Sequence, residues 1–380
     1  MTASCFDARP GRAGTASYKW DKYPAGTLPF WVADMDFASP PAVIAALKAR
    51  AAHGVYGYTR IPESLTQAIC AHLAGRYRWQ VDPEWLVFLP GIGPGLNLAC
   101  RAFTADDEAV MTVTPVYPPI LGAPARQGRR LQAVPAVLEN GRWRLPLEAL
   151  EAAVTPQTRL FIFCHPHNPL GRAWERDELK AVTDLCHRHD LVLCSDEIHA
   201  DLVLDAVPHV PAVVADPALV ERSITFMAPS KTFNLPGLQI GFAVIPGAEL
   251  RRRFRAVADT AMDLDLAGCF AVVGAEAAYR EGGEWLAELL DYLRGNRDLV
   301  ERFVAASLPG ATMTHVEATY LAWLDVRGLG LADPARACLE AGVALSDGGS
   351  FDGPGYLRFN FACPRPTLQE GLERLQTAFG

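Results

Sequence analysis

The sequence lacks several features that would place it in other classes of protein. No stretch of about 18 apolar residues predicts a membrane span, and the first residues do not combine the basic, apolar and cleavable parts of a signal peptide. The nine cysteines are scattered without a C-x-x-C pair, which predicts reduced thiols in the cytoplasm. The formal net charge is -8 and the one basic cluster, at 251–255, lies in a helix-like run, so neither nucleic acid nor membrane is expected as a partner.

The sequence also lacks internal repeats and a glycine- or serine-rich linker. Its 380 residues, half of them hydrophobic and 21% charged, are typical of a globular protein with two domains. We expect an N-terminal segment, 1–45, that joins the small domain, a large domain over 46–280, and a small C-terminal domain over 281–380. The boundary near residue 280 should lie inside or beside a helix.

What is present is an alternation of short apolar runs with longer amphipathic segments. Strands are predicted at 86–89, 108–114, 159–164, 191–195 and 223–227. Between them, 175–188 has the apolar spacing of a helix. This pattern predicts an α/β fold, with a mostly parallel central sheet and helices on both faces. The last hundred residues predict a smaller α+β domain, with a helix over 285–306, strands at 320–325 and 356–360, and a final helix from Thr367.

A lysine follows the strand at 223–227, in the segment APSKTFNLPG at 228–237. Ligands of open α/β sheets bind at the carboxyl ends of the strands, which is where Lys231 would lie. Lysine forms Schiff bases with carbonyl groups, and burial or a nearby cation makes it nucleophilic. Ser230 could donate to a phosphate. By itself, the dipeptide would indicate only a surface lysine.

Two further strand ends carry polar residues. The strand in LVLCSDEIH, 191–199, ends at Asp196, which could keep a pyridine nitrogen protonated or could cap the next helix. The segment HPHNPLGR, 165–172, is ordinary turn sequence, but Asn168 could donate its amide to a phenolic oxygen. Cys164, His165 and His167 are too few to define a metal site without partners elsewhere, so no metal is expected.

A glycine-rich segment, GIGPG at 91–95, lies between the strand at 86–89 and a helix predicted from Leu96. Its backbone N–H groups and the helix N-terminus could bind a phosphate. The spacing matches neither the dinucleotide-binding nor the P-loop pattern.

Taken in order, these motifs resemble the fold-type I pyridoxal 5'-phosphate (PLP) enzymes of the class I/II aminotransferase superfamily. Four further segments resemble the branch of cystathionine β-lyases and C–S lyases that includes the maltose-regulon modulator: WVADMDF at 31–37, TPVYPP at 114–119, DEIHADL at 196–202 and LRFNFACPR at 357–365. The similarity runs from about Trp20 to the C-terminus.

The resemblance implies how PLP would be held. Lys231 would form the Schiff base with the cofactor, and Asp196 would pair with the pyridine nitrogen. Asn168 would bond the phenolic oxygen, and Tyr117 would stack on the ring.

The phosphate group has its own implied contacts. The amides of Ile92 and Gly93, with Ser230, would hold it. Tyr58 looks like the tyrosine that reaches the phosphate of the partner subunit, which implies a homodimer with shared active sites, whereas Tyr56 looks like a packing residue.

Arg358 matches the arginine that binds the α-carboxylate of the substrate, and its guanidinium suits two parallel hydrogen bonds. Read alone, it could be a surface arginine on an edge strand. Ala33 and Asn168 would also contact substrate. The implied reaction is α,β-elimination of cystathionine or a related cysteine S-conjugate to a thiol, pyruvate and ammonia, with Lys231 as the base at Cα.

Two alternatives stay open. An aminotransferase would use the same fold and cofactor but would need a keto acid, and a regulatory role would act through surface contacts. Two departures from the resembled pattern concern local structure: Pro236 would stiffen the loop behind Lys231, and Gly93 stands where relatives tend to have valine. The glycine-rich stretch 347–355 predicts a mobile loop that could form part of a substrate lid.

Overall fold

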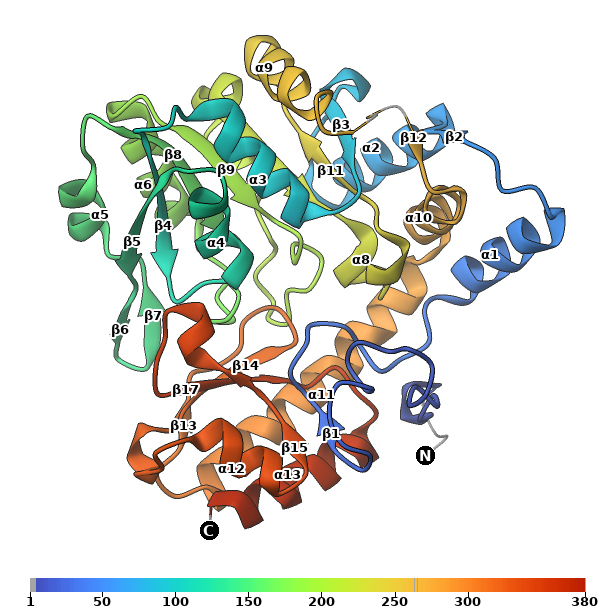
Figure 1. The fold of residues 1–380 in the computed structure, drawn as a ribbon, viewed down its shortest axis with the longest axis vertical. Coiled ribbons are helices and arrows are strands. Elements are labelled where there is room, and N and C mark those ends of the chain that lie inside the picture. Colours follow the sequence, from blue (N-terminus) through green and yellow to red (C-terminus); the bar gives the residue numbers. More distant parts are fainter. Residues whose placement is uncertain (1–4, 263, 265, 380) are drawn as a thin grey trace.

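A seven-stranded sheet forms the centre of the upper part of the molecule in Figure 1. The structure is a computed structural model that describes residues 5–262, 264 and 266–379. Neighbouring strands are parallel from β10 to β5, whereas β11 is antiparallel to both β10 and β3. The strands in spatial order are β3 (Leu86–Leu89), β11 (Gly241–Val244), β10 (Ser223–Met227), β9 (Val192–Asp196), β8 (Thr158–Cys164), β4 (Ala109–Thr114) and β5 (Arg130–Pro135).

Both faces of this sheet are buried. Alternate side chains of a strand point to opposite faces, so Leu160 and Ile162 belong to one hydrophobic cluster and Phe161 and Phe163 to another. The first face is covered by α3 (Ile92–Phe103), α4 (Pro118–Arg126) and α9 (Ala248–Ala258). The second is covered by α2 (Glu63–Tyr77), α5 (Leu147–Ala153), α6 (Arg176–Arg188) and α10 (Cys269–Glu281). The predicted α/β fold with a mostly parallel sheet is confirmed.

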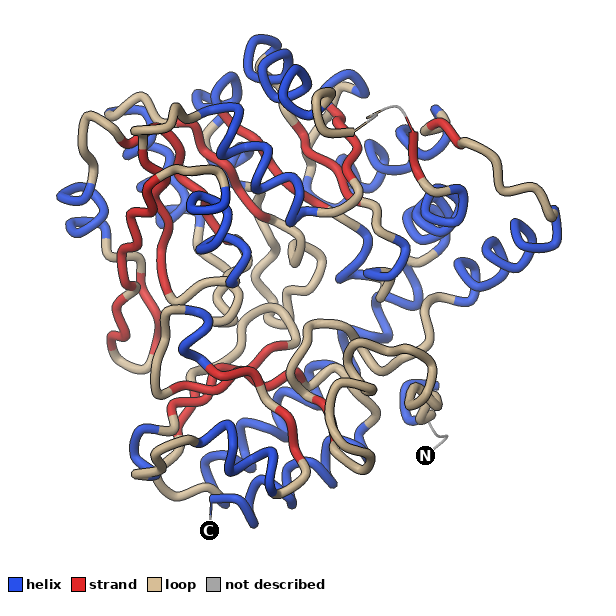
Figure 2. The backbone as a smooth tube through the Cα atoms, in the orientation of Figure 1, coloured by secondary structure: helices blue, strands red, loops and turns tan. Residues whose placement is uncertain are grey.

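A four-stranded antiparallel sheet lies in the lower part of Figures 1 and 2. Its order is β13 (Thr312–Met313), β14 (Leu321–Asp325), β17 (Tyr356–Asn360) and β16 (Ser346–Asp347). Three helices accompany it: α11 (Gly283–Ser307), α12 (Pro334–Glu340) and α13 (Arg365–Phe379). The N-terminal segment reaches this part, because β1 (Leu28–Pro29) pairs in parallel with β15 (Val343–Ala344).

The chain passes between the two parts where α10 ends and α11 begins, with Gly282 between them. The division into 1–45, 46–280 and 281–380 stays a prediction. Helix α1 (Pro41–His53) lies against α10. The remaining short elements are β2 (Thr59–Arg60), β6 (Val137–Glu139), β7 (Arg142–Arg144), α7 (Ala212–Ala215), α8 (Pro229–Thr232), β12 (Leu266–Ala267) and the 3-10 helices Cys5–Asp7, Pro83–Trp85, Pro217–Arg222, Pro236–Leu238, Arg327–Leu329 and Gly348–Phe351.

Within the described ranges, every helix is too short or too polar to cross a lipid bilayer.

Candidate active site

Three neighbouring parallel strands, β8, β9 and β10, end side by side at one edge of the large sheet. The register pairs Asp196 with Cys164 on one side and with Phe226 on the other, so the three strand ends are level. The segments that follow them carry Asn168 and Lys231. Together with Asp196, both line a cavity of about 220 Å³. The sequence-predicted residues therefore meet where the parallel strands end, as expected for an open α/β sheet.

Lys231 lies in α8, directly after β10, and its side chain is one wall of this cavity. The ammonium group donates to the carbonyl oxygen of Ala33 at 2.5 Å. Burial, assisted by the positive charge of Arg358, lowers the pKa of Lys231 to about 8. A substantial fraction of this amine is therefore neutral near pH 8, as a nucleophile requires. The reading of Lys231 as a surface lysine is wrong.

Asp196 is the last residue of β9 and is 3% exposed. Its Oδ1 accepts a bond from the backbone N–H of Ile198 at 3.3 Å, and a turn follows rather than a helix, so the alternative role as a helix cap is wrong. Burial raises the pKa of Asp196 to about 7, although Lys231 and the bond from Ile198 oppose this. A buried carboxylate of this kind would be stabilised by a protonated ring nitrogen.

Asn168 and Tyr117 also line this cavity. The Oδ1 atom of Asn168 accepts a bond from Arg358 at 3.0 Å, so the amide nitrogen is the end available to a ligand. Tyr117 precedes α4, and its backbone N–H donates to the carbonyl of Asn168 at 3.0 Å. Burial raises the pKa of Tyr117, which therefore stays neutral.

The glycine-rich segment also lines this cavity, and its structure corrects one sequence prediction. Helix α3 begins at Ile92 rather than at Leu96, so Gly93 lies in its first turn. A Cβ atom on Gly93 would meet nothing within 4 Å, and Ser230 lines the same cavity. Helix N-termini bind phosphate through unpaired N–H groups. Gly95 serves packing, since a Cβ there would lie 2.8 Å from the ring of Phe226.

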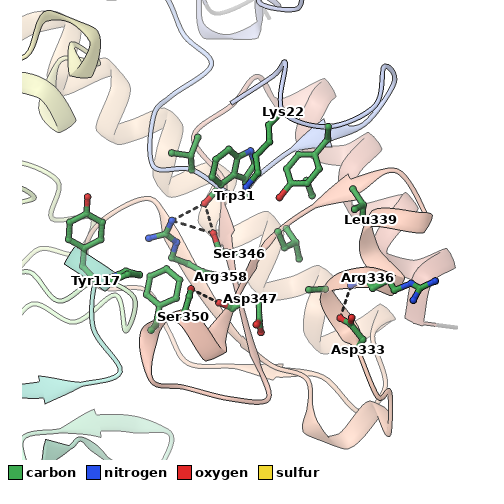
Figure 3. Close-up of a pocket in the computed structure, with 17 residues that line it drawn as sticks. Lys22, Trp31, Tyr117, Asp333, Arg336, Leu339, Ser346, Asp347, Ser350 and Arg358 are labelled. Carbon is green, nitrogen blue, oxygen red and sulfur yellow. Dashed lines mark hydrogen bonds between the residues drawn. The ribbon is translucent and has the colours of Figure 1, made fainter. Parts of the chain in front are cut away.

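Arg358 lies on β17, which has a neighbour on each side, and is only 4% exposed, so the reading as a surface arginine on an edge strand is wrong. Its guanidinium also donates to the carbonyl of Trp31 at 2.8 Å (Figure 3). The same group lies over the ring of Phe351, 4.6 Å from its centre. Burial lowers the pKa of Arg358 to about 10, so it remains cationic at neutral pH.

Arg358 and Tyr117 also line a second, larger cavity of about 590 Å³. Trp31, Lys22 and Ser346 contribute to its walls, and the ammonium of Lys22 lies 4.0 Å from the centre of the Trp31 ring. Because Tyr117 lines both cavities, the outer one adjoins the inner space around Lys231. An amino acid whose carboxylate reached Arg358 would have room for a large side chain.

The segment at 31–36 contributes backbone carbonyls to the site. The carbonyl of Ala33 accepts bonds from both Lys231 and Tyr320, and Asn360 donates to the carbonyls of Val32 and Asp34. Ala33 thus contacts the amine of Lys231 and also lines the inner cavity, while its predicted contact with substrate stays a prediction. Tyr320 and Asn360 were missed as site residues because nothing in the sequence places their strands beside this segment.

The structure does not bring Tyr58 to the cavity. This tyrosine is 97% exposed, whereas the ring of Tyr56 packs on Phe270, with 5.5 Å between ring centres. Tyr58 lines a neighbouring pocket that shares Pro90, Gln239 and Ile240 with the inner cavity, and its predicted role depends on a partner subunit.

Pro236 is the first residue of a 3-10 helix, a position where the missing N–H costs no hydrogen bond. Within the glycine-rich stretch 347–355, four residues form a 3-10 helix, and a Cβ on Gly348 would lie 2.3 Å from the carbonyl oxygen of Gly353. The mobility of this stretch stays a prediction.

The candidate metal residues bond to protein groups instead. His165 pairs with the carbonyl of Val210 and His167 with that of Pro115, while burial lowers the pKa of His165 to about 3 and that of His167 to about 4. Within the described part of the chain, no group of three or more potential ligands gathers to hold a metal ion.

The inner cavity fits PLP on structural grounds. It presents an amine of lowered pKa, a buried carboxylate, a free amide and a helix N-terminus in one enclosed space. His199 also lines this cavity, and its buried Nδ1 has no hydrogen-bond partner among the described residues. The sequence signal for His199 was its place in the motif DEIH, three residues after Asp196.

Residues 27–375 match the family of class I and II aminotransferases, and the chain belongs to this family, as the motifs predict. It is 38% identical to cystathionine beta-lyase PatB of Bacillus subtilis, over 98% of this chain and 99% of that protein. Two solved structures are close to it. OvoB has a TM-score of 0.95 and 43% identity, and cystalysin from Treponema denticola, which contains PLP, has a TM-score of 0.94 and 31% identity; each alignment covers 98% of both chains.

Proposed function

We propose that this protein is a PLP-dependent carbon–sulfur lyase that cleaves cystathionine or a related cysteine S-conjugate to a thiol, pyruvate and ammonia. The observation that carries the proposal is the pair of adjoining cavities. The inner one gathers Lys231, Asp196 and Asn168, and the outer one extends beyond Arg358 with about 590 Å³ of space. The similarity to proteins named cystathionine beta-lyase and C-S lyase supports this choice over other amino-acid chemistry.

The residues of the inner cavity would divide the work of binding the cofactor. Lys231 would attach PLP, Asp196 would keep the pyridine nitrogen protonated, and Asn168 would donate to the phenolic oxygen. Tyr117 would stack on the ring. Bound PLP supplies an electron sink for the charge that develops at Cα of the substrate.

The phosphate would lie at the N-terminus of α3. Ile92 and Gly93 offer backbone N–H groups there, and Ser230 offers a hydroxyl. A large share of the binding energy of the cofactor would come from this end of the cavity.

Two residues would act on the substrate itself. Arg358 would bind the α-carboxylate through two parallel hydrogen bonds, exchanging its present bond to Trp31 for the ligand. The amine of Lys231, with a pKa lowered toward 8, would remove the proton from Cα. Loss of a thiolate from Cβ then follows if the substrate carries sulfur there.

Tyr58 is the reason to propose a homodimer. A tyrosine that is 97% exposed on one chain, beside an exposed Val55, would become buried at a subunit interface and could reach the partner's phosphate site. We also propose that the enzyme is cytoplasmic and that its domains divide near residues 45 and 280.

The experiment is a lyase assay with PLP and L-cystathionine in the absence of any keto acid. We expect pyruvate from the wild-type enzyme and, for Lys231→Ala, a fall of at least about 10³-fold with loss of the Schiff-base absorbance. If the protein binds PLP but forms no pyruvate from cystathionine or from other S-conjugates, the proposal of lyase activity is wrong. Amino transfer that requires a keto acid would instead assign the protein to the aminotransferases, the second function that this family offers.

A further inference from the structure

Four largely buried charges gather near the N-terminus, and neither the motifs nor the proposed function assigns them a task. We call this group, Arg12, Lys19, Asp34 and Asp36, the N-terminal charge cluster. The side chain of Lys19 is fully buried, and its ammonium lies 2.8 Å from the carboxylate of Asp36 and 3.5 Å from that of Asp34. Arg12 contacts the same two carboxylates at 2.6 Å and 2.7 Å. Two cations thus neutralise two carboxylates.

The cluster also bonds to the backbone of the 31–36 segment. The ammonium of Lys19 donates to the carbonyl of Asp34 at 2.9 Å, and the indole N–H of Trp31 donates to the carbonyl of Lys19 at 3.1 Å. A buried ammonium without such partners would be costly, so these bonds fix the lysine and the segment together. The segment is therefore held on both sides of Ala33.

The same segment holds the amine that would attach PLP. The carbonyl of Ala33 accepts the hydrogen bond from the amine of Lys231. Lys19 and Lys231 thus donate to the carbonyls of two adjacent residues, Asp34 and Ala33. A displacement of this backbone would move the acceptor that orients the amine of Lys231.

The charges of the cluster also act on Lys231 through space. Burial and then the positive charge of Arg358 lower the pKa of Lys231 most; among the smaller influences, Asp34 and Asp196 raise it and Lys19 lowers it. Loss of Lys19 would leave the negative charge of Asp34 less compensated, which favours the ammonium form of Lys231. The other titratable groups that line the inner cavity or share the carbonyl of Ala33 are Tyr117, Cys164, His199 and Tyr320.

We propose that Lys19 is a positioning residue: its buried ammonium fixes the backbone that holds the amine of Lys231, and it neutralises the carboxylate of Asp34 in that backbone segment. The inference rests on the proposed function, in which the neutral amine of Lys231 attacks the aldehyde carbon of PLP with loss of water. Lys19 therefore increases the fraction of this amine that is neutral near pH 7. An ion pair that served folding alone would leave that fraction unchanged.

The test is the rate at which the full-length, cofactor-free protein takes up PLP, followed by the Schiff-base absorbance across a range of pH. Lys19→Met keeps the length and the apolar stem of the side chain but removes its charge. We expect the midpoint of the rate profile to rise by about one pH unit, so that uptake at pH 7 is about tenfold slower and recovers at high pH. The double variant Lys19→Met/Asp34→Asn, which removes one charge of each sign, should return the midpoint toward the wild-type value.

Arg172→Lys is the control for lost stability, because it weakens a buried ion pair whose members do not line the inner cavity. We expect this variant to unfold at a lower temperature and to keep the wild-type midpoint. Should Lys19→Met not fold, Asp34→Asn alone decides, because the excess of positive charge beside Lys231 should then lower the midpoint.

Two results overturn the inference in distinguishable ways. If the wild-type protein takes up no PLP at any pH, the proposed function fails and the inference fails with it. If the wild type takes up PLP but Lys19→Met, or Asp34→Asn in its place, keeps the wild-type midpoint, only the role of Lys19 is wrong. A rate that falls equally at every pH belongs to this second result, since it shows that the cluster serves stability alone.

Discussion

Two carboxylates five residues apart, Asp196 and Asp201, have opposite electrostatic surroundings. Asp201 is not among the residues that line the inner cavity; Arg76 contacts it at 2.6 Å and His72 at 3.0 Å, and the Tyr77 hydroxyl donates to it at 2.5 Å. These partners hold the pKa of Asp201 well below its usual range. Asp196 has no ion pair within the described part of the chain, and burial raises its pKa to about 7.

Two buried arginines repeat the contrast. Arg172, 1% exposed, forms ion pairs with Glu178 at 2.6 Å and with Glu317 at 2.5 Å. Arg358, 4% exposed, bonds only to neutral oxygens among the described residues. Asp201 and Arg172 thus form ion pairs, whereas Asp196 and Arg358 form none within the described part of the chain. Such an unpaired buried charge costs stability in the free protein, and a ligand of opposite charge removes that cost.

Among substitutions that alter these paired and unpaired charges, the largest loss of activity is expected at Asp196. Asp196→Asn removes the negative charge that would hold the ring nitrogen protonated, so we expect kcat/KM for pyruvate formation to fall by about 10²–10³-fold. The neighbouring Glu197 is equally buried, but it pairs with His209 at 2.7 Å and accepts a bond from Ser195. Glu197→Gln is therefore the matched control, and equal losses in the two variants would refute a special role for Asp196.

A smaller effect is expected at Arg358. Arg358→Lys keeps the positive charge but loses the planar pair of donors, so kcat/KM should fall by about tenfold to hundredfold, mainly through KM. Arg172→Lys should lower the thermal stability and leave KM unchanged. Steady-state kinetics and thermal unfolding of both variants test these two expectations. A rise of KM in Arg172→Lys as large as that in Arg358→Lys would contradict them.

The smallest expected effects concern the stability of the protein without cofactor, and the pH dependence of that stability has opposite signs for Asp201 and Asp196. The lowered pKa of Asp201 contributes stability that is complete above the usual aspartate pKa of about 3.9 and is lost as the pH falls below it. Asp201→Asn should therefore reduce the free energy of unfolding by about 2 kcal/mol at pH 7 and by less at pH 3.

Asp196 should behave in the opposite way. Because its pKa is raised to about 7, ionisation in the folded state costs stability as the pH rises from about 4 through 7. Asp196→Asn should leave the cofactor-free protein at least as stable as the wild type at pH 8. Denaturant unfolding of both variants across this pH range tests the pair, and destabilisation by Asp196→Asn equal to that of Asp201→Asn would contradict it.

Much of the fold follows from local patterns. The predicted strands at 86–89, 223–227 and 356–360 match β3, β10 and β17, and the helix predicted over 175–188 is α6 with Glu175 as its N-cap. The start of α3 was placed four residues too late, because a Gly-Pro-Gly sequence disfavours helix locally. Tertiary packing overrides that preference, since Gly95 lets the helix lie directly against Phe226 and Leu89.

The candidate site likewise has residues that local sequence patterns predict and residues that only tertiary packing brings together. Lys231, Asp196 and Asn168 were predictable because each follows a strand of a parallel sheet, and the ends of such strands meet at one edge. The carbonyl of Ala33 and the hydroxyl of Tyr320 could not be predicted as neighbours of Lys231, because they reach it through the fold of the 31–36 segment and the smaller sheet.

The sequence by itself determined the family and the strand-end positions of Lys231, Asp196 and Asn168, and it predicts Arg358 as the carboxylate-binding residue, since each lies in a contiguous motif. Only the tertiary structure decided which charges are paired, how large the two cavities are and that Tyr58 lies exposed on the surface. The physical reason is that pKa, burial and cavity volume depend on contacts between residues far apart in sequence, such as Arg358 with Asn168 and Trp31.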